Sequence, residues 1–354
     1  MTEPLQSLIA CGTQLWLDSV DPDLVAENFA WGATGATSNP IIVADLIKSG
    51  RFDERLAALA QLPVSDEEIA WSLTDELVSR AEQVFLPVWQ RTQGDDGYVS
   101  FELDPLIEDP QRDLDHDVRV ARYVELGQHW SAGHPNRMIK VPATPAGIDA
   151  LPELARAGVP LNVTLNFSMR QYQAARDAIW RGVQQRGDTM RFKSVFSIFV
   201  SRIDVYTKQN ASSLSPRAQG IVGIVNAQRI WQANQEFWRH HPTPLRQQIV
   251  FASTGTKNPA ESPWKYVAAL AGADIQTNPP ATNEAVLQSG ETFERRVDRL
   301  PDADVLAEID RLVDAESMER QLMIEGIDKF VRPQIELMRL IAEKRREIAA
   351  LSNS

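Results

Sequence analysis

The stretch "LNVTLNFSMRQYQAARDAIWRGVQ" (161–184), followed by "SVFSIFV" (194–200), decides the fold class of this chain. Residues 161–165 and 194–200 are short apolar runs typical of strands, and residues 168–184 have the apolar spacing of an amphipathic helix. A strand, a helix and a second strand in this order predict a βαβ unit, in which the strands are parallel and the helix covers them.

The same alternation extends along the whole chain. Short apolar runs lie at residues 14–18, 32–38, 98–103, 138–142, 161–165, 194–200, 248–254 and 273–277. Helical patterns lie at residues 65–90, 168–184, 258–271 and 315–350, and Ser65 and Glu68 have the spacing of a capping box. Eight parallel strands in 354 residues favour a closed (β/α)8 TIM barrel over an open doubly wound sheet.

We therefore expect residues 1–354 to form one barrel domain with a helical C-terminal extension at residues 300–354. The pattern leaves three roles open for the long helix of this extension. It would cover the barrel, form a homodimer contact, or lie over the mouth of the functional site.

Composition excludes several classes of partner. The formal net charge of −12 argues against nucleic-acid binding, which needs a concentrated basic face. The single cysteine, Cys11, rules out an internal disulfide and fits a reducing compartment. The N-terminal segment has no basic region of a secretory signal, and no apolar run approaches the ~18 residues of a membrane span. We therefore expect a cytoplasmic protein that contacts neither nucleic acid nor membrane.

Polar residues recur at the ends of the predicted strands. Successive strand residues point to opposite faces, and in four runs the polar residues share one face while apolar residues share the other. The polar residues predicted to face the barrel interior are Asp18, Glu102, Lys140, Asn162 and Thr164. Barrel enzymes build their active sites at the C-terminal strand ends, and buried charges are costly to keep for stability alone. These residues therefore predict an active site.

Lys140 lies in the middle of the apolar run "RMIKVPAT" (137–144). One interpretation is a strand-end lysine that reaches water or pairs with a structural acid. The other is a nucleophile, because desolvation favours the uncharged amine that forms a Schiff base with a carbonyl. The resulting iminium would act as an electron sink. The pattern alone leaves both interpretations open.

The acids and the first amide also have two interpretations. Asp18 or Glu102 alone is more often a helix cap or one half of a surface ion pair, whereas together they fit general acid–base catalysis. The "TSNP" that contains Asn39 predicts a turn before a helix that begins at Pro40. That turn does not exclude a side-chain amide directed at a substrate.

Basic residues after two later strands suggest an anion site. Arg202 follows the sixth run, and Lys257 lies in a Ser/Thr/Gly loop just before a predicted helix N-terminus. A phosphate that bridges Arg202, Ser253 and Lys257 would fit, although each base taken singly is more often a solvated charge. The five histidines form no HExxH motif and have no cysteine partners, so we expect no metal site.

Six motifs in the same order resemble the transaldolase family. They are "GATGATSNP" (32–40), "GYVSFELDP" (97–105), "MIKVPATPAGIDAL" (138–151), "NVTLNFS" (162–168), "SIFVSRID" (197–204) and "ASTGTKNP" (252–259). The resemblance covers residues 14–287, and several collinear motifs are far more specific than any one of them.

The resemblance implies a role for each candidate residue. Lys140 would form the Schiff base with a ketose phosphate, and Asp18 would take the proton of the C4 hydroxyl. Glu102 would act through a water held near Thr164. The dihydroxyacetone unit and the phosphate would be bound by Asn39, Asn162, Ser197, Arg202, Ser253 and Lys257. No metal and no organic cofactor is implied, since the protonated imine withdraws the electrons.

The implied reaction is transfer of dihydroxyacetone from sedoheptulose 7-phosphate or fructose 6-phosphate to an aldose phosphate, in the pentose phosphate pathway. One alternative is a fructose-6-phosphate aldolase that releases free dihydroxyacetone. Such aldolases are shorter and carry tyrosine at the glutamate position, so Glu102 and the chain length favour the transferase. An alternative of another class is a non-catalytic barrel that binds a sugar phosphate.

Three residues depart from the family pattern. Ile41 stands where a small residue usually follows "SNP", and Asn166 and Asn278 replace apolar residues in "NVTLNFS" and "TNPPAT". These departures concern substrate preference, since no group that the mechanism needs is missing.

Overall fold

The eight strands form a closed parallel barrel in chain order. In a computed structural model that describes residues 3–186 and 191–352, β1 pairs with β2 and also with β8, which closes the barrel. The strands are β1 (Gln14–Leu17), β2 (Gly35–Thr37), β3 (Val99–Glu102), β4 (Arg137–Pro142), β5 (Leu161–Asn166), β6 (Ser194–Phe199), β7 (Gln248–Ala252) and β8 (Ile275–Asn278). The predicted (β/α)8 barrel is thus confirmed, and the open doubly wound sheet is excluded.

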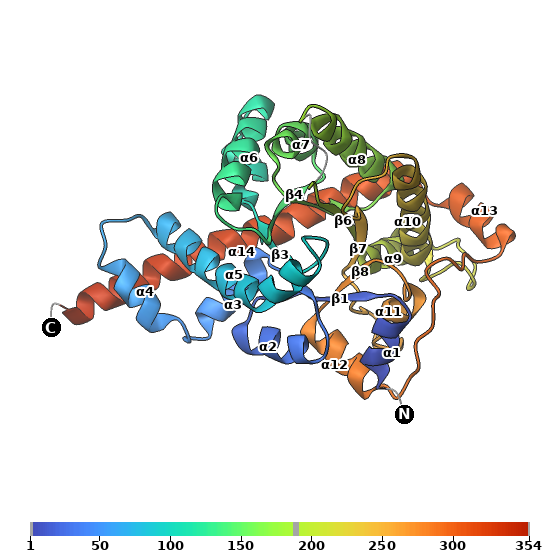
Figure 1. Ribbon diagram of the computed structural model, residues 1–354, viewed down its shortest axis with the longest axis horizontal. Helices are drawn as coiled ribbons and strands as arrows, with labels where there is room; N and C mark the ends of the chain where they lie inside the picture. Colours follow the sequence, from blue (N-terminus) through green and yellow to red (C-terminus); the bar gives the residue numbers. More distant parts are fainter. Residues whose placement is uncertain (1–2, 187–190, 353–354) are drawn as a thin grey trace.

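Helices surround this barrel (Figure 1). They are α1 (Pro4–Ala10), α2 (Pro22–Ala30), α3 (Pro40–Lys48), α4 (Asp53–Ala60), α5 (Asp66–Arg91), α6 (His116–Ser131), α7 (Pro145–Ala157), α8 (Met169–Gln184), α9 (Val200–Asn210), α10 (Val222–His240), α11 (Lys265–Ala269), α12 (Pro280–Gln288), α13 (Ala303–Leu312) and α14 (Ala315–Ser352). Two short 3₁₀ helices, η1 (Pro105–Glu108) and η2 (Pro110–Arg112), follow β3. None of the helices in the described ranges is long and apolar enough to cross a membrane.

Local sequence signals start several of these helices. Ser65 and Glu68 form the predicted capping box: the Glu68 N–H donates to Ser65 Oγ (3.2 Å), and the Ser65 N–H donates to Glu68 Oε2 (2.7 Å). Asn39 caps α3, which has Pro40 as its first residue, so the predicted turn is confirmed.

The helix predicted at residues 258–271 is wrong over its first half, since α11 has only 5 residues. Pro259 and Pro263 lie in the predicted first turns, and a proline disfavours the helical conformation of the residue before it. Lys257 therefore lies in an irregular loop instead of next to a helix N-terminus.

The barrel interior follows the predicted alternation of strand residues. Its lower layer is an apolar cluster of Trp16, Tyr98, Met138, Val195, Val250 and Ile275. Gly35 leaves space for the Trp16 side chain of this cluster, because a Cβ at residue 35 would lie 2.6 Å from the Trp16 indole. The polar residues predicted to face inward continue along the same strands toward the C-terminal ends.

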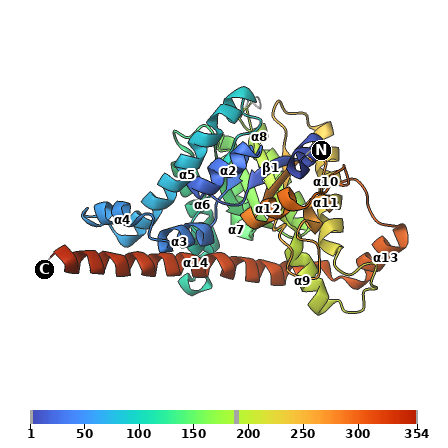
Figure 2. The ribbon, with the colours of Figure 1, turned by 90° about the horizontal axis from the view of Figure 1, so that it is seen from below.

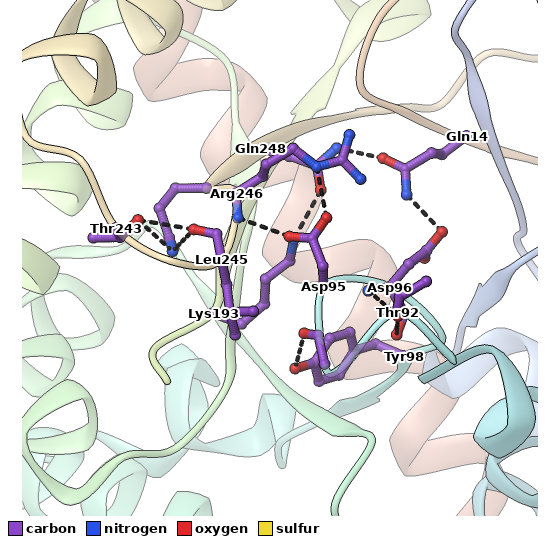
Figure 3. A network of polar contacts seen from close by, with 12 residues as sticks. Gln14, Thr92, Asp95, Asp96, Tyr98, Lys193, Thr243, Leu245, Arg246 and Gln248 are labelled. Atoms are coloured by element: carbon purple, nitrogen blue, oxygen red, sulfur yellow. Dashed lines mark hydrogen bonds and ion pairs between the residues drawn. The ribbon is translucent and has the colours of Figure 1, made fainter. Parts of the chain in front are cut away.

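A polar network closes the opposite, N-terminal end of the barrel (Figure 3). Trp16 Nε1 donates to Asp96 Oδ1 (3.1 Å), and Lys193 Nζ donates to Gln248 Oε1 (2.8 Å) and lies 3.3 Å from Asp95 Oδ1. Because nearly every member of this network has a polar partner, it closes the barrel without leaving charges unpaired.

Helix α14 runs across one side of the molecule, as Figures 1 and 2 show, and packs on α3, α4, α5, α9 and η1. Near its far end, Arg345 Nη1 lies 3.0 Å from Asp66 Oδ1. Nearer its start, Phe330 lies over Lys140, with the Lys140 Nζ 5.6 Å from the ring centroid. The long helix therefore both covers the barrel and reaches the mouth of the site, while the homodimer contact stays a prediction.

Candidate active site

A pocket of about 490 Å³ opens at the C-terminal ends of the strands. Its walls come from β2, β4, β6, β7 and β8, from the segments that follow several strands, and from α14. The predicted site residues that line it are Asp18, Asn39, Lys140, Ser197, Arg202, Ser253 and Lys257. The other three, Glu102, Asn162 and Thr164, do not line this pocket.

Lys140 lies on β4 and is only 5% exposed. Its Nζ donates to Glu102 Oε2 (3.0 Å) and to the Ser38 carbonyl oxygen (3.1 Å). An ammonium has three donors, so these contacts leave one position for the pocket that Lys140 lines.

Glu102 ends β3 directly beside Lys140 in the strand register. Burial raises the pKa of its carboxyl, although the positive charge of Lys140 opposes this shift. Since Glu102 does not line this pocket, it would act on a bound substrate through Lys140 or through solvent.

Asp18 follows β1, and a short chain of hydroxyls holds it. Thr37 Oγ1 donates to Asp18 Oδ1 (2.8 Å) and lies 2.9 Å from Thr277 Oγ1. Both threonines line the pocket, and the sequence analysis missed them. The alternation of residues along the short strands β2 and β8, which places Thr37 and Thr277 on the inward face, is the sequence signal that could have identified both.

Two asparagines differ in how far their amides are engaged. Asn162 is fully buried: its Nδ2 donates to Ser100 Oγ (2.9 Å), and its Oδ1 accepts from Ser197 Oγ (2.7 Å). Asn39 uses its Oδ1 to accept from the Ile42 N–H (3.1 Å), so its Nδ2 is left for the pocket. Asn162 therefore orients Ser197, and Asn39 offers a donor.

Thr164 is fully buried on β5, in register with Pro142 of β4. Its Oγ1 has no hydrogen-bond partner among the described residues. A buried hydroxyl without a protein partner is a site where a water or a ligand is expected.

One end of the pocket is cationic. Arg202, Ser253 and Lys257 all line it, so the structure brings the predicted phosphate ligands together. The Arg202 guanidinium lies 4.9 Å from the Phe199 ring centroid, and its Nη1 is buried without a partner among the described residues. Burial lowers the pKa of Arg202. A buried donor without an acceptor costs free energy unless an anion accepts its hydrogen bond.

Ser253 is held in a left-handed backbone conformation, with φ 55°. This conformation is uncommon for a residue with a side chain and costs free energy. Its Oγ lies 2.9 Å from Ser201 Oγ. The strained position fits a residue whose hydroxyl has a function.

Helix α14 supplies one wall of the pocket, which is one of the three roles left open for it, but none of its residues was predicted to belong to the site. Glu325, Lys329 and Phe330 line the pocket, far along the chain from the strands. The helical pattern of the extension contained no signal that distinguishes these residues from solvated ones.

The three departures from the family pattern lie in different surroundings. Ile41 is 39% exposed and lines the pocket. Asn166 is buried, and its Nδ2 donates to the Val163 carbonyl oxygen (2.8 Å). Asn278, the last residue of β8, accepts from Thr254 Oγ1 (2.6 Å). Only Ile41 contacts the space where a substrate would lie.

Among the residues at 3–186 and 191–352, no group of three or more His, Cys, Asp or Glu side chains could hold a metal ion.

Comparisons with known proteins agree on one family. Residues 15–341 match the family model described as Transaldolase/Fructose-6-phosphate aldolase. The chain is 33% identical to a transaldolase of Thermobifida fusca, over 97% of this chain and 99% of that protein. It is 31% identical to transaldolase 2 of Streptomyces avermitilis, over 93% and 94% of the two chains, and 29% identical to a transaldolase of Trichodesmium erythraeum, over 97% and 98%.

Proposed function

Because the chain belongs to the transaldolase/fructose-6-phosphate aldolase family, we propose that Lys140 carries a dihydroxyacetone unit as a Schiff base. The enzyme is a transferase that moves this unit between sugar phosphates in the pentose phosphate pathway. The observation that supports Lys140 is its position: a nearly buried lysine at the pocket, held by an equally buried glutamate 3.0 Å away. A lysine kept only to reach water would not need this setting.

The first step needs an uncharged amine. Burial raises the pKa of Glu102, so its carboxylate accepts a proton from Lys140 more readily than an exposed one would. The amine then adds to the C2 carbonyl of the ketose phosphate to give a carbinolamine. Glu102, acting through a water at Thr164, returns the proton to the departing hydroxyl, and water leaves as the iminium forms.

The second step breaks the bond between C3 and C4. Asp18 takes the proton of the C4 hydroxyl, the C4 carbonyl forms, and the bonding electrons pass into the iminium to give an enamine. The aldose phosphate leaves, and the enamine attacks the aldehyde of the acceptor while Asp18 returns a proton to the new hydroxyl. Thr37 donates to Oδ1 of Asp18 and leaves Oδ2 for this transfer.

The remaining residues hold the substrate in place. Asn39 and Ser197 hydrogen-bond the dihydroxyacetone unit, with Asn162 orienting Ser197 or exchanging its contacts for the ligand. Arg202, Ser253 and Lys257 bind the phosphate. The cytoplasmic location and the homodimer, which the sequence suggested, stay predictions.

Borohydride trapping tests the proposal. Incubation with fructose 6-phosphate and borohydride, followed by peptide mass mapping, is expected to place a reduced three-carbon or hexose phosphate adduct on Lys140. The adduct is expected to vanish in Lys140→Met and to persist in Lys208→Met, which removes an exposed lysine of α9 outside the pocket. Trapping on another lysine, or none in the wild type, contradicts the proposal.

A second assay separates the transferase from an aldolase. Turnover of fructose 6-phosphate is expected to depend on erythrose 4-phosphate as acceptor. Release of free dihydroxyacetone at full rate without acceptor would instead indicate aldolase activity.

A further inference from the structure

Helix α14 forms part of the cationic end of the pocket. Glu325 and Lys329 are spaced i, i+4 on this helix, so they share one face, and both line the pocket together with Arg202 and Lys257. The chain therefore brings a third basic side chain to the proposed phosphate site, from a segment outside the barrel.

The approach of α14 to Arg202 is close. A Cβ at Gly326 would lie 3.0 Å from Leu165 Cδ2 and 3.6 Å from Arg202 Nη1. Gly326 thus lets the helix backbone pack against β5 and against the same guanidinium nitrogen that has no partner among the described residues. Glu325 and Lys329 stand on either side of this contact along the helix.

The charges at this end of the pocket are unbalanced. Lys329 has no carboxylate within ion-pair distance among the described residues, whereas Arg332, Lys344 and Arg345 of the same helix each pair with one. Partial burial and the nearby positive charges of Arg202 and Lys257 lower the pKa of Lys329, while Glu325 and Asp328 oppose the shift. Four basic side chains line the pocket, Lys140, Arg202, Lys257 and Lys329, against the two acidic side chains of Asp18 and Glu325.

We propose that Lys329 is a third cationic ligand of the substrate phosphate and that Glu325 is the counter-ion that balances this site before the phosphate binds. The proposal rests on the proposed function, since it concerns the same phosphate. A phosphate dianion would complete Arg202 Nη1 and pair with Lys329 and Lys257. Because Phe330 follows Lys329 directly and lies over Lys140, the phosphate would also hold the helix over the reacting carbon.

The test compares Lys329→Gln with Lys208→Gln, which removes a lysine of α9 that does not line the pocket. The probes are inorganic phosphate as a competitive inhibitor, and erythrose 4-phosphate against erythrose as acceptors. For Lys329→Gln, the inhibition constant of phosphate and the KM for erythrose 4-phosphate are expected to rise by about five- to tenfold, because an ion pair of an exposed lysine is weaker than that of a buried guanidinium. The kcat/KM for erythrose is expected to stay within about twofold, and Lys208→Gln to change neither quantity by more than about twofold.

Two further variants sharpen the test. Lys329→Arg is expected to restore most of the phosphate affinity, because it restores the charge. Glu325→Gln is expected to lower the inhibition constant of phosphate, since it removes the competing carboxylate. A rise in that constant for Glu325→Gln overturns its role as counter-ion.

Phosphate inhibition unchanged in Lys329→Gln, or equal losses with erythrose and erythrose 4-phosphate, overturns the role of Lys329. Borohydride trapping of each variant separates this failure from that of the proposed function. An adduct on Lys140 in wild type and Lys329→Gln, with no change in phosphate inhibition, refutes only the present inference. Absence of any adduct in the wild type refutes the proposed function itself.

Discussion

Lys140 Nζ lies 3.0 Å from Glu102 Oε2, and each of the two side chains is only 6% exposed. The two residues are direct neighbours in the register of β3 and β4, so the pairing of the strands itself sets an acid beside the proposed nucleophile. In a setting of low dielectric, such a pair exchanges a proton more readily than the same groups in water. In the proposed mechanism, this pairing allows Glu102 to activate the amine of Lys140 and later to assist the loss of water.

The first prediction concerns Glu102. Glu102→Gln is expected to lower kcat by about 10²- to 10⁴-fold, the usual effect of losing a general acid–base group. Because burial raises the pKa of Glu102, the ion pair with Lys140 is lost as the pH falls through a value above the ordinary 4.5. The acid limb of the kcat/KM profile is therefore expected to lie above 4.5 in the wild type and to be absent in the variant. Steady-state kinetics across pH measure both effects.

Asp104→Asn provides the matched control for Glu102→Gln. Asp104 is also buried, and burial also raises its pKa, but its carboxylate accepts from the Leu106 N–H and caps η1, whereas that of Glu102 pairs with Lys140. Asparagine is an equally good cap, so kcat and the acid limb are expected to survive. If Asp104→Asn removes the limb and Glu102→Gln keeps it, the assignment of the acid is wrong.

The second prediction concerns Arg202. Arg202→Ala is expected to raise the KM for phosphorylated sugars by about 10- to 100-fold, because a charge-assisted contact is worth about 1.5–3 kcal/mol. The KM for free dihydroxyacetone is expected to change much less. Steady-state assays with both donors give the comparison, and equal effects on the two would mean that Arg202 does not bind the phosphate.

Much of the barrel could be predicted because its signals are local. The alternation of residues along a strand depends only on neighbours in the chain, and it correctly placed Lys140 and Asn162 on the same face as Glu102 and Ser100. The capping box at Ser65 is equally local.

Other features of the site depend on tertiary contacts, which a single sequence does not specify. The position of α14 is set by packing against α3 and α5 and by ion pairs such as that of Arg345 with Asp66. Lys329 and Phe330 therefore looked like ordinary residues of an amphipathic helix. Pro259 and Pro263 are visible in the sequence, and both already argue against a helix over the first half of residues 258–271.

The third prediction concerns stability. Arg137 begins β4 and is fully buried: its Nε lies 2.5 Å from Glu82 Oε1, and its guanidinium lies 4.8 Å from the Phe101 ring centroid. Arg137→Met is expected to lower the free energy of unfolding by about 3–5 kcal/mol, because it leaves Glu82 buried without its main partner. Urea denaturation measures the loss.

Arg137→Met combined with Glu82→Gln is expected to recover part of that stability, since Glu82 then leaves no buried charge, while the ion pair of Arg137 with the partly exposed Asp75 stays lost. Both variants are expected to keep the kcat of the folded enzyme, because neither residue lines the pocket. A double variant less stable than Arg137→Met alone would show that the pair does not act through its charge.

The fourth prediction concerns Lys193, at the closed end of the barrel opposite the site (Figure 3). Burial lowers the pKa of Lys193 from 10.5 to about 8, although Asp95 and Asp96 oppose the shift. Between about pH 8 and 10.5 the unfolded chain thus binds more protons at this residue than the folded protein. Stability from Lys193 is therefore expected to increase as the pH rises through this window, in contrast to a lysine whose pKa an ion pair has raised.

Lys193→Met removes this dependence, and its comparison with the wild type isolates the effect. The free energy of unfolding of the wild type, relative to Lys193→Met, is expected to increase by about 1–3 kcal/mol between pH 8 and 10. Arg246 still pairs with Asp95 through a contact of 2.6 Å in the variant, so the carboxylate is not left alone. Lys208→Met, which removes an exposed lysine, is expected to give a constant difference across the same range. A difference for Lys193→Met that decreases with pH would mean that Asp95 dominates over burial, and that the folded protein holds this lysine charged more strongly than the unfolded chain does.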